Sequence, residues 1–515
     1  MKHYTQFRAT MVGLALLLGT VNAVAQANSY QQTNLVSDLT GAAAHTDPKL
    51  TNPWGIAFVP GQPFVIANNK SGSSTSYDAN GVSQGDFLIP APRNQNSLAT
   101  PSGTAVAEDG DFVLGDADSK FLFATEDGTI SGWNGSGNAI VAVDHSASGA
   151  VYKGLAVLSP ACCATYLVVA NFHSGLIEPY TQAFIPLAPP GSFTDPGLPA
   201  GYAPFNIQQV RNQVFVTYAV QDNAKRDPVN APGNGIVDIF DLEGNFVRRF
   251  ASNGMLNSPW GVTQASASFG QFSNAILIGN FGDGTINAFD PTSGNFLGQL
   301  KDQTGATLTN ASLWGLVFGA GGTGDANTLY FTAGLADEGH GLFGAITAAA
   351  PTPDYSLVAA PQDAAVAAGG SATFMLTVTP ASGFAGTVDL SCAAPAGVAC
   401  TLNPPSVTPR AGAATSVLTV TTSPAMVQSN GGPKMMATLI AGLLGCFVVG
   451  AGRSRRGVHC LYAGFASILI AGALLASTGC GGGGSGQANR RTASIVVTAT
   501  SGALRHTSTI HLTVQ

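Results

Sequence analysis

The chain has 515 residues, of which 45% are hydrophobic and only 10% are charged, and its formal net charge is −7. This length predicts two to four domains, and low charge with 64 Gly and 29 Pro is typical of all-β exported proteins rather than helical cytosolic enzymes. The one basic run is short and lies at 453–456, which excludes nucleic-acid binding as a function.

The first 25 residues have the pattern of a secretory signal peptide. Lys2 and Arg8 precede the apolar run MVGLALLLG, and AVA at 23–25 fits a cleavage site that leaves Gln26 as the first mature residue. An uncleaved N-terminal anchor is the alternative. We therefore expect export to the periplasmic or extracellular side, where disulfides can form.

Seven cysteines are too few for a disulfide scaffold in a chain of this length. Cys392 and Cys400 lie 8 residues apart in a β-rich segment, and we predict a bridge between them. The adjacent Cys162 and Cys163 leave two alternatives open, a strained vicinal bridge or two unpaired thiols. The sequence contains no CxxC motif and no Cys/His zinc spacing.

Residues 33–347 contain six repeats of about fifty residues, and each begins at a marker position. Successive markers are 48, 51, 52, 55 and 54 residues apart. The markers are Gly55, Gly103, Gly154, Asn206, Gly261 and Gly315. Short apolar or alternating segments joined by turn residues follow the markers. This pattern predicts four strands per repeat and a six-bladed β-propeller.

The sixth repeat has no evident fourth strand, whereas the segment TNLVSDLTG at 33–41 has no partner beside it. We predict that 33–41 supplies the outer strand of blade six and closes the ring, which removes the exposed edges of an open ring. Residues 111–119 are either an additional strand or an insertion in blade two.

The stretches NPWGIAF, FATEDGTISGWN, VYKGLAV, ANFHSGLI and GNFGDGTINAFD resemble a family of secreted bacterial propellers. That family is similar to the NHL-repeat and gluconolactonase-like propellers. The resemblance covers roughly residues 33–347. It implies the propeller fold but no established reaction.

A second domain is expected after a linker at 348–353, where the composition changes to Ala, Thr, Val, Pro and Ser. The run VDLSCAAPAGVACTLNPPSVTP within 354–423 resembles bacterial Ig-like repeats. An Ig-like sandwich needs about seven strands, and about five fit this segment. Residues 492–515 supply two more strands, so we predict one Ig-like β-sandwich that is split in two.

The segment that splits the sandwich is predicted to be a two-helix transmembrane hairpin. Residues 435–452 and 458–479 are runs of 18 and 22 residues without Asp, Glu, Lys or Arg, close to the about 20 that span a bilayer. The arginine-rich turn 453–457 should stay cytoplasmic, which places both sandwich parts on the exported side. A buried helical hairpin and a lipoprotein signal ending at Cys480 are the alternatives. Residues 480–491 are expected to form a Gly-rich linker.

Candidate ligand-binding residues are expected on the propeller face at which the inner strands begin. In a propeller this face also carries the loops that follow the second strands, so several repeats contribute to one concave site. The candidates are Trp54, Trp260, Trp314, Lys153, Tyr218 and His173. The tryptophans either line a funnel that stacks on a glycan or another flat ligand, or they are wedges buried between blades.

The resemblance to gluconolactonase-like propellers implies that Asn68, Glu126, Asn171 and Asn280 together hold a divalent cation. Ca²⁺ would suit such oxygen ligands and would polarise a carbonyl group. The alternative is that these polar residues stabilise turns. We assign no catalytic residue, because the G-x-S-x-G, P-loop and H-E-x-x-H motifs are all absent.

Together these features predict an exported, membrane-anchored propeller that acts as a binding or interaction protein on the cell envelope. Its partner would be the membrane, through the two helices, and a glycan, small-molecule or protein ligand at the propeller face. A metal-dependent hydrolase of the lactonase kind and a structural envelope protein are the alternatives.

Overall fold

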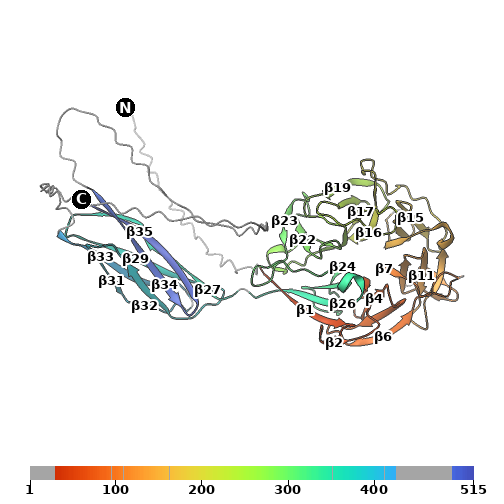
Figure 1. The fold of residues 1–515 in the computed structure, drawn as a ribbon, viewed down its shortest axis with the longest axis horizontal. Coiled ribbons are helices and arrows are strands. Elements are labelled where there is room, and N and C mark those ends of the chain that lie inside the picture. The colour runs from red at the N-terminus through yellow and green to blue at the C-terminus, as the bar shows by residue number, and fades with distance from the viewer. Residues whose placement is uncertain are drawn as a thin grey trace, which may run out of the picture. The chain divides into compact units, whose positions relative to one another are not determined.

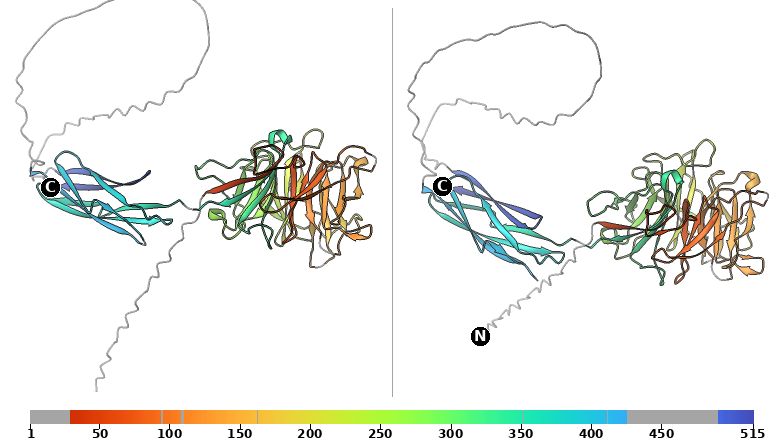
Figure 2. Two further views of the ribbon diagram at one scale, coloured as in Figure 1. Left: turned by 90° about the horizontal axis from the view of Figure 1, so that it is seen from below. Right: turned by 60° about the horizontal axis from the view of Figure 1, so that its bottom comes forward.

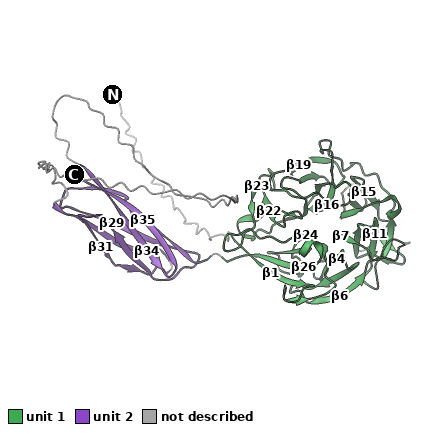
Figure 3. Cartoon of the chain, in the orientation of Figure 1, with its two compact units in different colours: residues 1–352 green, residues 353–515 purple. Residues whose placement is uncertain are grey.

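The structure of the protein is a computed structural model that describes residues 29–424, apart from 94, 108–109, 162, 351 and 411, together with residues 490–515. The chain divides into two compact units, Met1–Thr352 and Pro353–Gln515, which Figure 3 shows in different colours. Almost all regular structure in the described residues is β-strand.

Six sheets of the first unit, antiparallel except for one short parallel pair in blade six, surround a common axis (Figure 1). Each inner strand lies against the inner strand of the next blade, and the sixth lies against the first, so the ring is closed. The inner strands are β3 (Pro53–Ala57), β7 (Pro101–Val106), β13 (Tyr152–Leu158), β16 (Tyr202–Val210), β20 (Pro259–Gln264) and β24 (Leu313–Phe318). The six-bladed β-propeller predicted from the repeats is therefore confirmed.

The remaining strands of each blade follow outward in chain order. The second strands are β4 (Phe64–Asn68), β10 (Phe121–Thr125), β14 (Tyr166–Asn171), β17 (Gln213–Val220), β21 (Ile276–Asn280) and β25 (Thr328–Ala333). The third strands are β5 (Ser73–Tyr77), β11 (Thr129–Trp133), β15 (Leu176–Thr181), β18 (Ile236–Phe240), β22 (Ile286–Phe289) and β26 (Leu342–Ala348). Blades one, two, four and five have the fourth strands β6 (Ser83–Leu88), β12 (Ile140–Asp144), β19 (Phe246–Ser252) and β23 (Phe296–Gln299). The sheet of blade three has three strands, so the prediction of four strands per repeat is wrong for this blade.

Three local features interrupt this regular plan. The segment 111–119 is an insertion in blade two, because it forms the small separate hairpin of β8 (Val113–Leu114) and β9 (Ala117–Asp118). Short 3₁₀ turns occur at η1 (Ser146–Ser148) and η2 (Gly270–Phe272). A single turn, α1 (Leu335–Glu338), follows the second strand of blade six.

The ring is closed by the first described strand of the chain. β1 (Tyr30–Ser37) pairs antiparallel with β26, from Tyr30 opposite Ala348 to Ser37 opposite Leu342. The short β2 (His45–Thr46) pairs with the outer edge of β1. The Tyr30 hydroxyl also donates a hydrogen bond to the Phe269 carbonyl of blade five, at 3.0 Å. The prediction that 33–41 completes blade six is confirmed, with the strand shifted slightly toward the N-terminus.

The apolar core is divided among the gaps between blades. Six buried clusters each join two neighbouring blades, and a seventh lies on the axis. Between blades two and three, for example, Leu122 and Ile130 pack with Leu155 and Leu167. Alternation along each strand sends side chains to both gaps beside the blade, so each blade is stabilised only when both neighbours are present.

The six marker residues form a belt around the axis. In five blades the marker is glycine, and there is no space for a Cβ atom at any of these five positions. A Cβ on Gly55 would lie 2.5 Å from the Thr104 backbone nitrogen, and one on Gly261 would lie 2.5 Å from the Trp314 carbonyl oxygen. Blade four has Asn206 at this level, and its side-chain amide donates to the Trp260 carbonyl at 2.8 Å. We call these six residues the axial belt.

The second unit is a β-sandwich of two sheets, whose long strands run side by side in Figure 2. One sheet consists of β27 (Asp354–Ala360), β29 (Ser371–Ala381), β33 (Ala414–Thr422) and β31 (Val398–Asn403). The other consists of β28 (Asp363–Val366), β35 (Leu504–Val514), β34 (Arg491–Ser501), β30 (Val388–Ala393) and β32 (Ser406–Val407). Leu376 and Leu418 of the first sheet share one core with Ile495 and Leu512 of the second.

Two features of the sandwich bear on the sequence analysis. β34 pairs antiparallel with β30, so residues after 490 complete a sheet that begins before 424. The predicted Cys392–Cys400 disulfide is confirmed, with a Cα–Cα distance of 6.5 Å. It joins β30 to β31 and therefore links the two sheets.

The predicted fold class is corrected in one respect, which is the transmembrane hairpin. Within residues 29–424 and 490–515 no helix is long and apolar enough to cross a membrane. The segments 435–452 and 458–479, the turn 453–457, the linker 480–491 and the signal peptide 1–25 lie outside the described residues. The predicted anchoring through two helices is withdrawn with the hairpin.

Replacing Gly55 by Ala should lower the free energy of unfolding of the propeller by about 3 kcal/mol, because the new methyl group would overlap backbone atoms of blade two that cannot move independently. Urea unfolding followed by tryptophan fluorescence measures this, since all four tryptophans lie in the propeller. Gly197→Ala is the matched control, because its Cβ would meet only an ordinary contact at 3.5 Å. Equal stability of the two variants would contradict the tight packing of the axial belt.

Candidate functional site

Three tryptophans fill the axis just above the axial belt, on the face at which the inner strands begin, which we call the tryptophan face. The rings of Trp54 and Trp314 are stacked at a centroid distance of 3.5 Å, and Trp260 meets Trp314 edge-on at 5.7 Å. Their exposed fractions are 2%, 0% and 4% for Trp54, Trp314 and Trp260. The structure brings the predicted tryptophans together, but as a packed plug rather than an open funnel.

Lys153 completes the plug on the side of blades two and three, and it is fully buried. Its ammonium group lies 5.0 Å from the centre of the Trp54 ring and forms an ion pair with Glu126. The Asn69 amide donates to the second Glu126 carboxylate oxygen at 2.8 Å. Burial alone would raise the pKa of Glu126, but Lys153 and these hydrogen bonds hold it below its ordinary value. The pair is thus a buried, neutralised unit.

Two loops cover this ion pair from other blades. In the blade-four loop 221–229, Arg226 donates to the Glu126 backbone carbonyl at 3.3 Å, and the Asp227 carboxylate lies 3.6 Å from the Lys153 ammonium. The turn α1 of blade six brings Glu338 into electrostatic contact with Glu126 and Lys153. The tryptophan face is therefore closed over its charged centre.

The turn α1 has an unfavourable backbone conformation. Ala336, Asp337 and Glu338 have φ values of 51°, 52° and 63°, which is the left-handed region. Each non-glycine residue there costs roughly 1–2 kcal/mol. Burial, and secondarily the charge of Glu126, raises the pKa of Glu338 to about 7. One Glu338 carboxylate oxygen is buried without a hydrogen-bond partner among the described residues.

The other predicted residues do not join the plug. Asn68, Asn171, Tyr218 and Asn280 occupy equivalent positions, each paired with the residue just before the plug position of its inner strand. The Tyr218 hydroxyl lies within blade four near Asp238, and burial raises its pKa. His173 follows Phe172, and its backbone carbonyl accepts a hydrogen bond from the Gln221 side chain at 3.4 Å.

The asparagines proposed as metal ligands instead stabilise the turns that follow the second strands. Asn171 donates to Glu178 at 2.6 Å and accepts from the Ser174 amide at 3.2 Å. Asn280 donates to Met255 and Asp283, and Asn68 donates to Thr75. Glu126 is engaged by Lys153. These residues do not fit a shared Ca²⁺ ion, and no group of three His, Cys, Asp or Glu in the described ranges is arranged to hold a metal.

The residues that do reach the axis lie one position further along the chain. They are Asn69, Glu126, Phe172, Ala219, Phe281 and Gly334, of which Phe172, Ala219 and Phe281 belong to the axial apolar cluster. The shift follows from strand geometry, because successive side chains point to opposite sides. These positions are polar in blades one and two and apolar or small in blades three to six. This change of residue type along the repeats is the sequence signal that could have identified the axial positions.

Recessed surface is found on the opposite face, at which the inner strands end, and we call it the pocket face. A cavity of about 240 Å³ lies at the axis between the ends of β3, β7, β13, β16 and β24. A second, of about 460 Å³, lies between blades three and four. A third, of about 440 Å³, lies between blades one and two. The last two are within the range of small-molecule sites, about 300–1,000 Å³.

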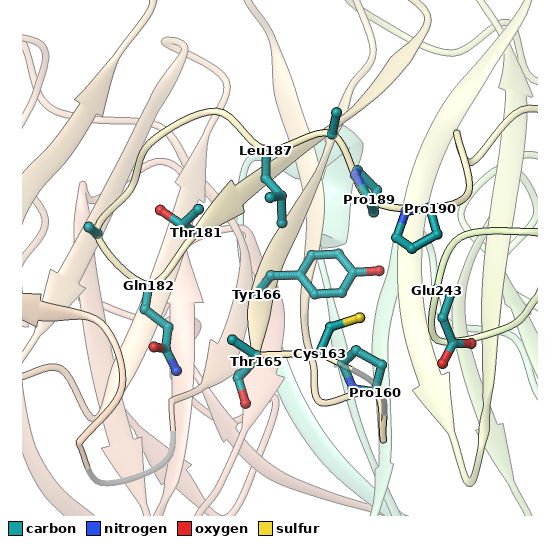
Figure 4. Close-up of a pocket in the computed structure, with 13 residues that line it drawn as sticks. Pro160, Cys163, Thr165, Tyr166, Thr181, Gln182, Leu187, Pro189, Pro190 and Glu243 are labelled. Carbon is teal, nitrogen blue, oxygen red and sulfur yellow. The ribbon is translucent and has the colours of Figure 1, made fainter.

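The pocket between blades three and four has a buried aromatic floor (Figure 4). The Tyr166 ring lies between Leu187 and Pro189 on one side and Cys163 and Pro160 on the other. The Tyr166 hydroxyl donates to the Leu242 carbonyl at 2.7 Å, which fixes the ring. Cys163 is disulfide-bonded, so it is not a thiol nucleophile. Polar groups, among them Gln182, Thr181 and Glu243, lie at the ends of the pocket.

Comparison with known proteins gives relatives but no activity. No protein-family model matches the chain. "Uncharacterized protein R648" of Acanthamoeba polyphaga mimivirus is 34% identical over 326 residues, which cover 61% of this chain and 78% of the relative. "Uncharacterized protein L690" of the same virus is 32% identical over 329 residues, which cover 61% of this chain and 84% of the relative.

Similar solved structures are more distant. A glucose dehydrogenase is 12% identical, with 62% of this chain and 100% of that chain covered and a TM-score of 0.41. A putative 6-phosphogluconolactonase from Bacteroides uniformis is 11% identical, with 48% and 70% covered and a TM-score of 0.30. At these scores neither structure informs the function of this chain.

Replacing Lys153 by Met should lower the free energy of unfolding by about 3–5 kcal/mol, because Glu126 would remain buried without a counter-charge. Adding Glu126→Gln to the same chain should restore most of the loss, since the buried site is then uncharged. Urea unfolding followed by circular dichroism compares the two variants. If the single and double variants were equally unstable, the ion pair would not be what stabilises the centre.

The raised pKa of Glu338 should make the protein less stable as pH rises. Folded Glu338 keeps its proton up to about pH 7, whereas the unfolded side chain loses it near the ordinary value of 4.5. The folded state therefore loses on the order of 3 kcal/mol as the pH rises through this window. Melting temperatures measured between these pH values should fall less steeply in Glu338→Gln.

Asp337→Asn is the matched control for this pH series, because it alters the neighbouring exposed carboxylate of the same turn. Burial also raises the pKa of Asp238 to about 7. Asp238 therefore adds the same decrease of stability with pH to the parent and to both variants. Identical pH profiles for the parent and Glu338→Gln would contradict the protonated state of Glu338.

Proposed function

The chain belongs to the same family as the mimivirus proteins R648 and L690, and we propose that it is an exported ligand-binding propeller protein. The proposed binding site is the pocket between blades three and four on the pocket face. The observation that carries this assignment is a recess of about 460 Å³ with a buried tyrosine as its floor. Ligand sites are typically concave, mostly apolar and lined by a few polar groups at their margins.

The lining favours a compact ligand with an apolar ring. Tyr166 is buried beneath the recess, and its own hydrogen bond holds the ring that forms the floor in place. Pro189 and Pro190 form a wall that cannot change its φ angles, so little conformational entropy is lost when a ligand enters. Burial of apolar surface against the proline wall and Leu187 would supply the affinity. Gln182 at one end, whose amide nitrogen donates to Asp111, would orient the ligand through its amide oxygen.

The metal-dependent hydrolase alternative has less support. It requires several oxygen ligands that converge on one point, whereas Asn68, Asn171 and Asn280 are each bonded within their own blade. It also requires access to the axis from the tryptophan face, where Trp54 and Trp314 are buried. A purely structural role would not need a ligand-sized recess. We therefore favour binding over hydrolysis.

Export is part of the proposal. It is supported by the signal-peptide pattern of the first 25 residues and by the Cys392–Cys400 disulfide. Disulfides persist in oxidising compartments outside the cytosol.

The proposal is tested with dansylamide, a neutral aromatic probe whose emission rises in apolar surroundings. The mature chain should bind the probe saturably. Ala188→Trp should weaken binding at least tenfold, because Ala188 is an exposed residue of the pocket wall and an indole there would occupy the recess. Fluorescence titration measures both affinities.

Ala306→Trp is the matched control, since it places an indole on an exposed loop that does not line this pocket. It should bind the probe as the parent does. Non-saturable emission in the parent, or equal affinities of the Ala188→Trp and Ala306→Trp variants, would overturn the assignment.

A further inference from the structure

A second recess on the pocket face has a different chemistry. The cavity of about 440 Å³ between blades one and two is lined by Trp133, Lys120, Gln62 and Gln84. It therefore combines an aromatic ring, a cation and two amides. The recess between blades three and four, by contrast, has no lysine or arginine in its lining.

Trp133 differs from the three tryptophans of the plug because it is only half-buried. Phe87 covers one face of its ring, with the centroids 4.1 Å apart and the planes at 4°. The indole N–H donates to the Gly137 carbonyl at 3.0 Å. With one face covered and the N–H satisfied, what Trp133 adds to the recess is an apolar ring surface.

Lys120 supplies a positive charge beside this ring. Its backbone amide donates to the Trp133 carbonyl at 2.7 Å, which fixes the two residues relative to each other. Its side chain extends over Gly135, where a Cβ would lie 2.9 Å from the ammonium nitrogen. Lys120 is exposed and forms no ion pair with the described residues. Its charge is therefore available to an anion.

Two glutamine amides complete the set. The Gln62 side chain is exposed and has no hydrogen bond within the described part of the chain. Gln84 donates only to the Val82 carbonyl, at 3.2 Å, which leaves its amide oxygen free to accept. Amides both donate and accept, as hydroxyl groups do, so they suit a ligand with several hydroxyls.

From this combination we propose that the recess binds an acidic sugar. The C–H face of the sugar ring would stack on Trp133, where it covers apolar surface. The carboxylate would pair with Lys120, and the hydroxyls would bond to Gln62 and Gln84. This site is separate from the pocket between blades three and four, so either assignment can fail without the other.

The test uses glucuronate as the probe and acrylamide quenching of tryptophan fluorescence as the readout. Trp54, Trp260 and Trp314 are at most 4% exposed, so Trp133 is the tryptophan that acrylamide reaches. Glucuronate at millimolar concentration should protect the mature chain from quenching. Glucose, which lacks the charge, and acetate, which lacks the ring, should each protect at least tenfold more weakly.

Lys120→Gln should weaken glucuronate binding at least tenfold, because a charge-assisted hydrogen bond is lost. Lys301→Gln is the matched control, since Lys301 is equally exposed and does not line the recess. Trp133→Phe, read by ligand-observed NMR, tests the stacking without a large change in the fold. Protection by acetate equal to that by glucuronate, or equal affinities of Lys120→Gln and Lys301→Gln, would overturn the proposal.

Discussion

The propeller depends on how closely six inner strands can approach a single axis. At the axial belt the backbones of neighbouring strands lie so near to one another that five blades have glycine and a methyl group would overlap main-chain atoms. Asn206 is the exception. Its side-chain amide donates a hydrogen bond to the inner strand of the next blade, so the two strands stay close together. Close approach at this level holds the inner strands of neighbouring blades in direct backbone contact around the axis.

The same constraint decides which face of the propeller is open. Just above the belt the three tryptophans, Lys153 and the neighbouring apolar side chains fill the axis. A buried ammonium there requires a carboxylate, and Glu126 meets that need. The recesses between blades one and two and between blades three and four lie on the opposite side, toward the other ends of the inner strands. Binding surface is thereby displaced from the axis to the gaps between blades.

Much of the fold could be predicted from the sequence, because spacing, alternation and turn residues are local signals. The markers, the six blades and the closing strand all follow from them. The site was harder to predict. Whether Asn68 or Asn69 faces the axis depends on a shift of one residue, which the sequence does not fix. The burial of Trp54 depends on the radius of the axial belt. The recesses depend on the conformations of loops such as 182–190, which have no repeating sequence pattern from which they could be predicted. No helix in residues 29–424 and 490–515 is long and apolar enough to cross a membrane, and the runs that predicted the hairpin lie outside those ranges.

Closure of the ring by β1 also determines when the propeller can fold. Tyr30 in β1 pairs with Ala348 in β26. β1 is therefore synthesised more than three hundred residues before the strand with which it pairs. The sandwich has the same property, since Asp363 in β28 pairs with His511. Neither unit can reach its final topology before its own last strand has been synthesised. Such late-closing contacts keep a polypeptide open during synthesis, which is the state in which a chain can be threaded through a translocation channel.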